Sequence, residues 1–215
     1  MNMTKIVVLD YGSSNLRSVA KALETVASKE HSITVSNKAE TILAADKVVF
    51  PGQGAIGQAM THLKEQALDD VIRECILNKP FLGICLGLQM LMEHSEEDGG
   101  VEGLGILPGN VVRFEDNVKD EQGNAYKIPS MGWNKVFQAK SHPLWQGIED
   151  GSRFYFVHSY YVDAKQESDI AANTDYICRY TSAAARDNLF ATQFHPEKSQ
   201  HAGLTLLKNF LNWQI

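Results

Sequence analysis

The sequence predicts an α/β fold with an open, mostly parallel sheet, flanking helices and an antiparallel extension. Strand-like apolar runs alternate with amphipathic helical segments through the first half of the 215-residue chain. These runs are apolar on both faces, which is typical of a parallel sheet covered on both sides. From Asn110 to about Cys178 the pattern becomes rich in short strands and turns, which predicts antiparallel pairing on the same core.

The first half supplies the parallel strands. The expected elements are a strand over 6–9, a helix with an apolar face of Leu16, Val19, Ala20, Leu23 and Val26, strands over 33–35 and 48–50, a helix over 68–78 and a strand over 81–84. Pro51–Gly52 is expected to end the strand over 48–50.

The second half supplies the extension and closes the fold. The polar segment 115–124 predicts an exposed loop, while 176–180 and 189–192 are strand-like. The expected C-terminal helix has an apolar side formed by Leu204, Leu207, Phe210 and Leu211.

Composition indicates one enzyme-sized domain over residues 1–215. The chain is 44% hydrophobic, enough for one substantial core, and its formal net charge of −6 argues against a nucleic-acid surface. No apolar stretch reaches the roughly 18 residues of a membrane span, and the N-terminus lacks a secretion signal. We therefore expect a cytoplasmic location and no membrane contact.

Three cysteines, Cys75, Cys85 and Cys178, have neither disulfide nor metal-site spacing. Cys75 lies in an amphipathic segment and Cys178 in a strand-like one, so we interpret both as packing residues. The remaining cysteine, Cys85, stands between two glycines in Gly83-Ile84-Cys85-Leu86-Gly87.

This pentapeptide has the pattern of a nucleophile elbow, a tight turn from a strand into a helix. Residues 89–93 resemble the start of that helix, and side chains at Gly83 or Gly87 would collide with the neighbouring strand or helix. A cysteine at a helix N-terminus is favoured as thiolate. The alternative is a buried structural cysteine.

A histidine and a carboxylate that could serve this cysteine lie in Gln193-Phe194-His195-Pro196-Glu197. Proline keeps His195 extended, so His195 and Glu197 share one side of the chain. Glu197 can then hold one imidazole nitrogen while the other faces Cys85, as in a catalytic triad. A lone histidine is usually structural, but the cysteine elbow favours the catalytic interpretation.

These motifs resemble the class I (triad) glutamine amidotransferases, and more closely the glutaminase subunits of imidazole glycerol phosphate synthase. The resemblance implies a flavodoxin-like sheet and runs nearly end to end, through 10–19, 51–55, 83–87, 103–109, 129–134, 155–161 and 193–200. Two residues depart from the usual pattern: Ser14 replaces a glycine and Ser130 a histidine. Neither belongs to the triad.

Pro51-Gly52-Gln53-Gly54 follows a strand at the carboxyl edge of the sheet, where open α/β proteins place their sites. Its backbone N–H groups, together with that of Leu86, could stabilise a tetrahedral oxyanion. An ordinary turn explains the sequence equally well. The resemblance favours the oxyanion role for Gly52, Gln53, Gly54 and Leu86.

The resemblance also implies the remaining site residues. Substrate glutamine would be held by Gln89 and by the segment His158, Ser159 and Tyr160, with Glu96 a weaker candidate for binding its amino group. The implied partner interface includes Asn15, Met131, Trp133 and Asn134. A partly buried core position is the alternative for Trp133.

The function implied is glutamine hydrolysis through a Cys85 thioester, without cofactor or metal. Ammonia would pass to a (β/α)₈ cyclase subunit in a heterodimer that makes imidazole glycerol phosphate and an aminoimidazole carboxamide ribotide in histidine biosynthesis. Alternatives are a glutaminase for another synthase, such as those making anthranilate or pyridoxal phosphate, a cysteine peptidase or small-molecule hydrolase, and a non-catalytic binding subunit. The block 131–134 argues against another synthase, and the intact triad against a non-catalytic subunit.

Overall fold

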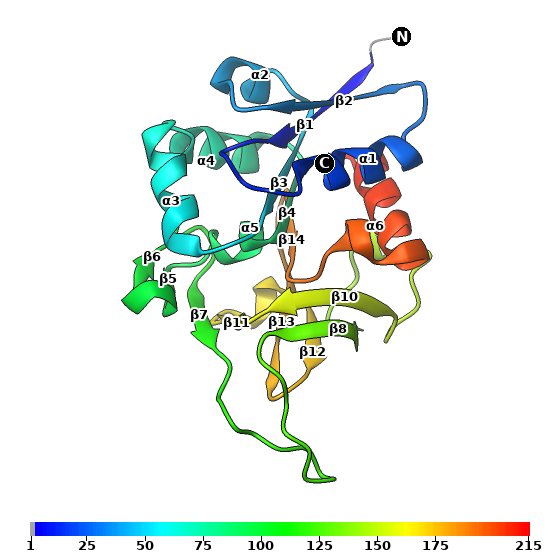
Figure 1. Ribbon diagram of the computed structural model, residues 1–215. Coiled ribbons are helices and arrows are strands. Elements are labelled where there is room, and N and C mark those ends of the chain that lie inside the picture. The colour runs from blue at the N-terminus through cyan, green and yellow to red at the C-terminus, as the bar shows by residue number, and fades with distance from the viewer. Residues whose placement is uncertain (1–2) are drawn as a thin grey trace.

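The computed structural model describes residues 3–215, and within them twelve strands form one mixed sheet (Figure 1). The main path of this sheet runs β2-β1-β3-β4-β14-β13-β11-β7-β5-β6, with β12 and β9 added beside β13. A separate antiparallel pair, β8 and β10, lies next to it. The predicted open, mostly parallel α/β sheet with an antiparallel extension is confirmed.

The helices are α1 (Leu16–Val26), α2 (Ala39–Leu43), α3 (Ile56–Glu65), α4 (Asp69–Asn78), α5 (Leu86–Gln89) and α6 (Gln200–Asn212), with short 3₁₀ turns that include η1 (Glu97–Gly99) and η4 (Pro196–Lys198). The strands are β1 (Thr4–Leu9), β2 (His31–Ser36), β3 (Lys47–Gly52), β4 (Phe81–Cys85), β5 (His94–Ser95), β6 (Val101–Glu102), β7 (Gly109–Arg113), β8 (Ser130–Lys135), β9 (Phe137–Gln138), β10 (Arg153–His158), β11 (Tyr160–Ala164), β12 (Ile170–Asp175), β13 (Arg179–Arg186) and β14 (Leu189–Thr192).

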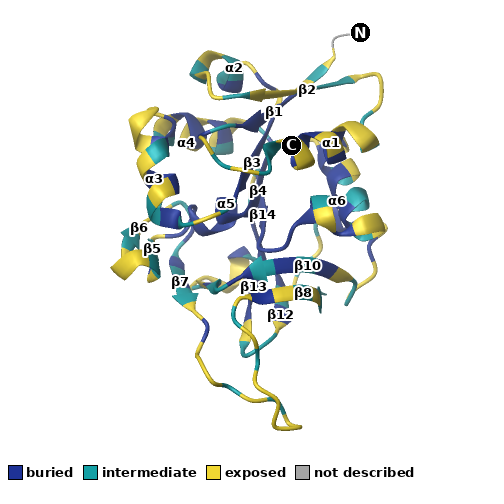
Figure 2. Ribbon diagram, viewed as in Figure 1, coloured by how far each residue is buried: buried dark blue, intermediate teal, exposed yellow. Residues whose placement is uncertain are grey.

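Five parallel strands, β2, β1, β3, β4 and β14, form the part of the sheet that is covered on both faces. Alternate residues of β1 enter opposite cores: Ile6 and Val8 pack with α1 and α6, whereas Val7 and Leu9 pack with α2, α3 and α4. Figure 1 shows these helix groups on opposite sides of the sheet, and Figure 2 shows β3, β4 and β14 as buried, whereas the edge strand β2 is intermediate to exposed. Helices therefore cover both apolar faces of the sheet.

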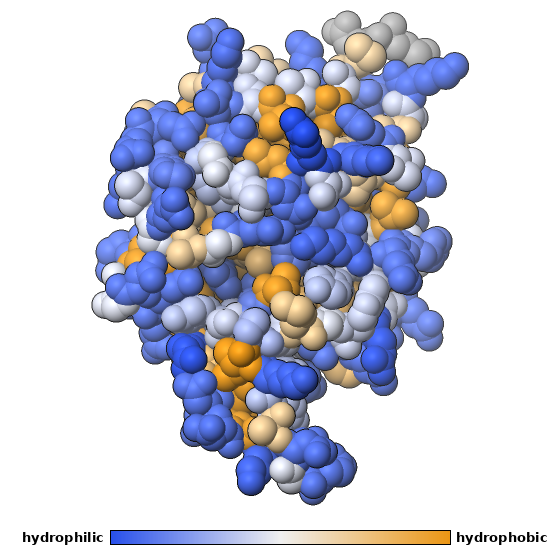
Figure 3. Space-filling model, viewed as in Figure 1, coloured by the Kyte–Doolittle hydropathy of each residue, from blue (hydrophilic) through white to orange (hydrophobic). Residues whose placement is uncertain are grey.

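The antiparallel extension continues from β14 through β13, β11 and β7. Residues 115–124 are mostly exposed and form the long loop at the bottom of Figures 1 and 2, as the sequence predicted. Within the described residues, no helix is long and apolar enough to cross a membrane. Figure 3 shows a largely hydrophilic face with small, scattered apolar patches.

Four local expectations were wrong. Strand β3 continues through Pro51 to Gly52, and α3 follows where no helix was expected. Residues 176–178 form a bend between β12 and β13 rather than strand, so Cys178 lies in that bend. The helix expected to start within 89–93 begins at Leu86 and ends at Gln89.

Candidate active site

Cys85 ends β4, and α5 begins at the next residue, so the strand-to-helix turn is confirmed. The backbone of Cys85 has φ 54° and ψ −106°, an unusual conformation for a residue with a side chain. A Cβ on Gly87 would overlap the Phe50 carbonyl oxygen, and one on Gly83 would lie 2.9 Å from the Cβ of Ala191. The two glycines therefore let the turn pack against β3 and β14.

The turn leads into a helix of only four residues, Leu86–Gln89. A single turn aligns few peptide dipoles, so the helix dipole contributes less to thiolate stability than the predicted longer helix would. Charge from a neighbouring side chain is then the more important influence on Cys85.

Strand β14 pairs in parallel with β4 and brings the His195 segment beside the elbow. His195 is extended, with φ −101° and ψ 97°, and its Nδ1 lies 2.8 Å from Oε1 of Glu197. Its other nitrogen, Nε2, is buried and lacks a hydrogen-bond partner among the described residues. The imidazole–carboxylate contact that the His-Pro-Glu spacing predicts is therefore present.

The protonation of His195 depends on these neighbours. Burial disfavours the charged ring, but the charge of Cys85 and the hydrogen bond and charge of Glu197 raise the pKa of His195 to about 10. An imidazolium at neutral pH lies beside the cysteine as a result. His195 is therefore placed to give a proton to a group that reacts at Cys85.

A side chain missed by the sequence analysis, Gln193, connects the nucleophile to Gln89. Gln193 is fully buried; its Nε2 donates to Sγ of Cys85 at 3.7 Å, and its Oε1 accepts from Nε2 of Gln89 at 3.1 Å. Gln89 also donates to the Tyr160 carbonyl at 2.9 Å. The signal for Gln193 was its position two residues before His195 in extended chain, which places both on one side.

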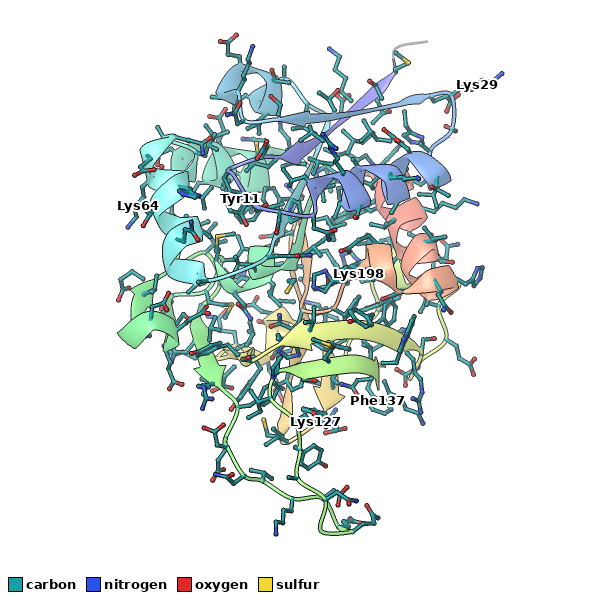
Figure 4. All side chains as sticks on the ribbon, in the orientation of Figure 1. Tyr11, Lys29, Lys64, Lys127, Phe137 and Lys198 are labelled. Carbon is teal, nitrogen blue, oxygen red and sulfur yellow. The ribbon has the colours of Figure 1, made fainter. Side chains whose placement is uncertain are left out.

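The glycine-rich segment after β3 lies next to the nucleophile. Gly52 pairs with Cys85 in the β3–β4 register, and a Cβ on Gly52 would overlap the hydroxyl of Tyr11, which is labelled in Figure 4. Gln53, Gly54 and Leu86 line the pocket in front of Cys85, and Gly54 has φ 92°. Gly52 lies behind them, buried in β3.

A pocket of about 270 Å³ opens over Cys85. It is lined by Gln53, Gly54, Cys85, Leu86, Gln89, Glu97, Pro129, Val157, His158, Ser159, Tyr160 and His195. His158 donates from Nδ1 to the Tyr160 carbonyl, 2.8 Å away, and burial lowers the pKa of His158 to about 4, so this ring is neutral. The predicted substrate residues Gln89, His158, Ser159 and Tyr160 are thus brought together.

The structure places Glu96 outside the pocket, contrary to the prediction that it binds the amino group of the substrate. Its side chain is exposed, accepts from the backbone N–H of Arg113 and does not line the pocket. The next residue, Glu97, lines it instead and accepts from the Ile56 N–H at 3.1 Å. Burial raises the pKa of Glu97. The short turn η1 decides which carboxylate points inward, and the sequence pattern did not predict this turn.

The proposed interface residues divide into two groups. Met131 is 65% exposed and Trp133 37% exposed on β8, with Asn134 half-buried beside them. Trp133 meets Tyr155 of β10 edge-on, and the Lys198 amine lies 5.9 Å from the centre of the Tyr155 ring (Figure 4). Asn15 instead directs its side chain to the triad, where it donates to Oε1 of Glu197 at 2.9 Å.

The other two cysteines have no comparable surroundings. Cys75 is buried in the core on the side of the sheet that α2, α3 and α4 cover, and burial raises its pKa. Burial also raises the pKa of Cys178. In the described part of the chain, no group of three or more His, Cys, Asp or Glu side chains is arranged to hold a metal ion.

The chain is similar in sequence to known proteins. The family model "Glutamine amidotransferase class-I" matches residues 7–213. The imidazole glycerol phosphate synthase subunit HisH of Aromatoleum aromaticum is 53% identical over 98% of this chain and 99% of its own length; HisH of Nitrosospira multiformis is 54% identical over 99% of both.

Solved structures share the fold at low identity. A putative GMP synthase component from Thermoplasma acidophilum has a TM-score of 0.70 at 20% identity, over 99% of this chain and 94% of its own. A glutamine amidotransferase from Thermotoga maritima has a TM-score of 0.63 at 16% identity, over 92% of this chain and 77% of its own. The family model and the sequence relatives place the chain in the class I glutamine amidotransferase family, in the group of the HisH subunits of imidazole glycerol phosphate synthase.

Proposed function

We propose that Cys85, His195 and Glu197 hydrolyse glutamine to glutamate and ammonia, within one glutamine amidotransferase domain over residues 1–215. The observation that carries the proposal is the buried His195–Glu197 pair beside the strained Cys85 elbow, opening into the 270 Å³ pocket. This arrangement provides a nucleophile, an acid–base group and an orienting carboxylate in one site.

The first half of the reaction forms a thioester. The Cys85 thiolate attacks the side-chain carbonyl carbon of glutamine, and the resulting oxyanion accepts hydrogen bonds from the N–H groups of Leu86 and of the segment 52–54. The tetrahedral intermediate collapses, the C–N bond breaks, and the His195 imidazolium gives its proton to the departing nitrogen as ammonia leaves.

The second half regenerates the enzyme. With the sulfur now in a neutral thioester, His195 loses the thiolate charge that raised its pKa, so its imidazole can accept a proton from water. Water attacks the thioester carbonyl, the C–S bond breaks, and glutamate leaves while Cys85 returns to thiolate. Glu197 holds the Nδ1 proton of His195 throughout.

The pocket also offers groups for the rest of the substrate. Both N–H bonds of Gln89 are used by Gln193 and Tyr160, so its oxygen remains as an acceptor for a substrate N–H group. Glu97 is the carboxylate of the pocket and suits the substrate ammonium group. The positive charge of the ammonium group would offset the free-energy cost of burying the Glu97 carboxylate.

The partner proposed is a (β/α)₈ cyclase subunit that uses the ammonia to make imidazole glycerol phosphate and an aminoimidazole carboxamide ribotide in histidine biosynthesis. It is supported by the relatives' name as subunits of imidazole glycerol phosphate synthase. The exposed Met131 and Trp133 on β8 are the proposed contact, because β8 pairs with β10, which leads to Val157 and His158 in the pocket.

The substrate role of Glu97 is tested by comparing adjacent carboxylates. In the enzyme assembled with its cyclase subunit, Glu97→Gln should raise the KM for glutamine by about 10- to 100-fold, since a hydrogen bond to a charged group contributes roughly 1.5–3 kcal/mol. Glu96→Gln, the matched control, should leave KM unchanged. The measurement is glutamate release against glutamine concentration, and equal KM values for the two variants would contradict the assignment.

A further inference from the structure

Asn15 occupies the N-cap position of α1 without capping it. Asparagine is among the residues whose side chain commonly accepts hydrogen bonds from the first N–H groups of a helix. Here Asn15 has a left-handed backbone, with φ 73° and ψ 4°, and its side chain makes no such bond. The side chain is directed to a residue 182 positions away in the sequence.

That residue is Glu197. Oε1 of Glu197 accepts from Nδ2 of Asn15 at 2.9 Å and contacts Nδ1 of His195 at 2.8 Å. Within residues 3–215 these are the two hydrogen-bond donors to the carboxylate, because Oε2 is buried without a partner. The Glu197 side chain is 0% exposed, so water does not replace either donor.

We propose that Asn15 is a positioning residue of the triad, which holds the Glu197 carboxylate with Oε1 toward His195. The inference rests on the proposed function, because it assigns Asn15 a role through Glu197. A buried carboxylate with a single hydrogen bond can rotate and is poorly compensated for the loss of water. The second donor therefore fixes the orientation of the carboxylate.

Few charged side chains lie near the Glu197 carboxylate. His195 contacts Glu197 directly, Cys85 lies beyond His195, and Lys198 extends over the Tyr155 ring. On α1, Arg17 is exposed. The amide of Asn15 thus supplies a neutral donor at a site where a second carboxylate would repel Glu197.

The test uses two variants in the complex with the cyclase subunit. Asn15→Leu removes the donor at similar volume and should lower kcat for glutamate release by about 10- to 100-fold, with KM little changed, because Glu197 acts on acid–base catalysis rather than on substrate binding. Asn15→Asp places a second carboxylate beside that of Glu197. The two carboxylates repel each other until one of them takes up a proton as the pH falls.

Once protonated, the carboxyl group introduced by Asn15→Asp can donate to Glu197 as the amide does. The kcat of the Asn15→Asp variant relative to the parent should therefore rise about tenfold or more between pH 9 and pH 6. A purely structural defect would give a ratio that is flat with pH. Ser18→Ala, in the exposed first turn of α1, is the control and should match the parent at every pH.

A kcat of Asn15→Leu within about twofold of the parent, or a flat pH ratio for Asn15→Asp, would overturn the inference. Cys85→Ala is assayed in parallel to separate this result from failure of the proposed function. If Cys85→Ala is inactive while the Asn15 variants match the parent, only the role of Asn15 is wrong. If Cys85→Ala hydrolyses glutamine normally, the proposed function itself fails.

Discussion

Replacing Cys85 with alanine is expected to lower product formation from glutamine by about 10³-fold or more, while product formation from added ammonium salt stays near the parent level. The lost side chain generates ammonia, whereas the acceptor reaction takes place on the cyclase subunit in the proposed complex. The measurement is synthesis by the assembled complex with each nitrogen source, at a pH where free ammonia is present.

The matched control is Cys178→Ala, because Cys178 lies in the bend between β12 and β13, away from the pocket. This variant should use both nitrogen sources like the parent. Loss of both activities in an intact Cys85→Ala complex, or loss of neither, would show that Cys85 is not the ammonia-generating nucleophile.

The second large effect is expected for Glu197→Gln. The amide oxygen can still accept from Asn15 and from Nδ1 of His195, but the negative charge that stabilises the His195 imidazolium is lost. General acid–base catalysis contributes about 10²- to 10⁴-fold, and we expect a loss of kcat within that range.

The same variant should lower the pKa of His195. In the parent, the hydrogen bond and charge of Glu197 contribute to raising this pKa to about 10, so their removal favours the neutral ring. An NMR titration of the histidine ring protons measures the change, with His158, whose pKa is about 4, as an internal reference. If neither the pKa of His195 nor kcat changed in the variant, Glu197 would not be a member of the triad.

The sequence was sufficient to predict the parallel core and the contact between His195 and Glu197. Both follow from local rules: short runs that are apolar on both faces predict buried parallel strands, and proline restricts the residue before it. The elbow was also predictable, because Gly83 and Gly87 are required wherever such a turn packs closely between strands.

The errors come from tertiary contacts that no local pattern records. Glu96 and Glu97 are equally polar neighbours, and the turn η1 decides which one enters the pocket. The sequence did not connect Asn15 with the triad, because it is the packing of α6 and η4 against α1 that brings Glu197 within reach of its side chain. The helix after Cys85 is shortened to one turn because the chain leaves it to form β5.

Reaction with a glutamine-like electrophile tests the central claim, that Cys85 is the nucleophile of this site, most directly. Cys85 lines the pocket beside His195, whereas burial raises the pKa of Cys75 and of Cys178 and keeps both as thiols. Peptide mapping of the labelled protein should find one label per chain, on Cys85, and glutamine should protect against it. A label on Cys75 or Cys178, or labelling that glutamine does not slow, would contradict the account.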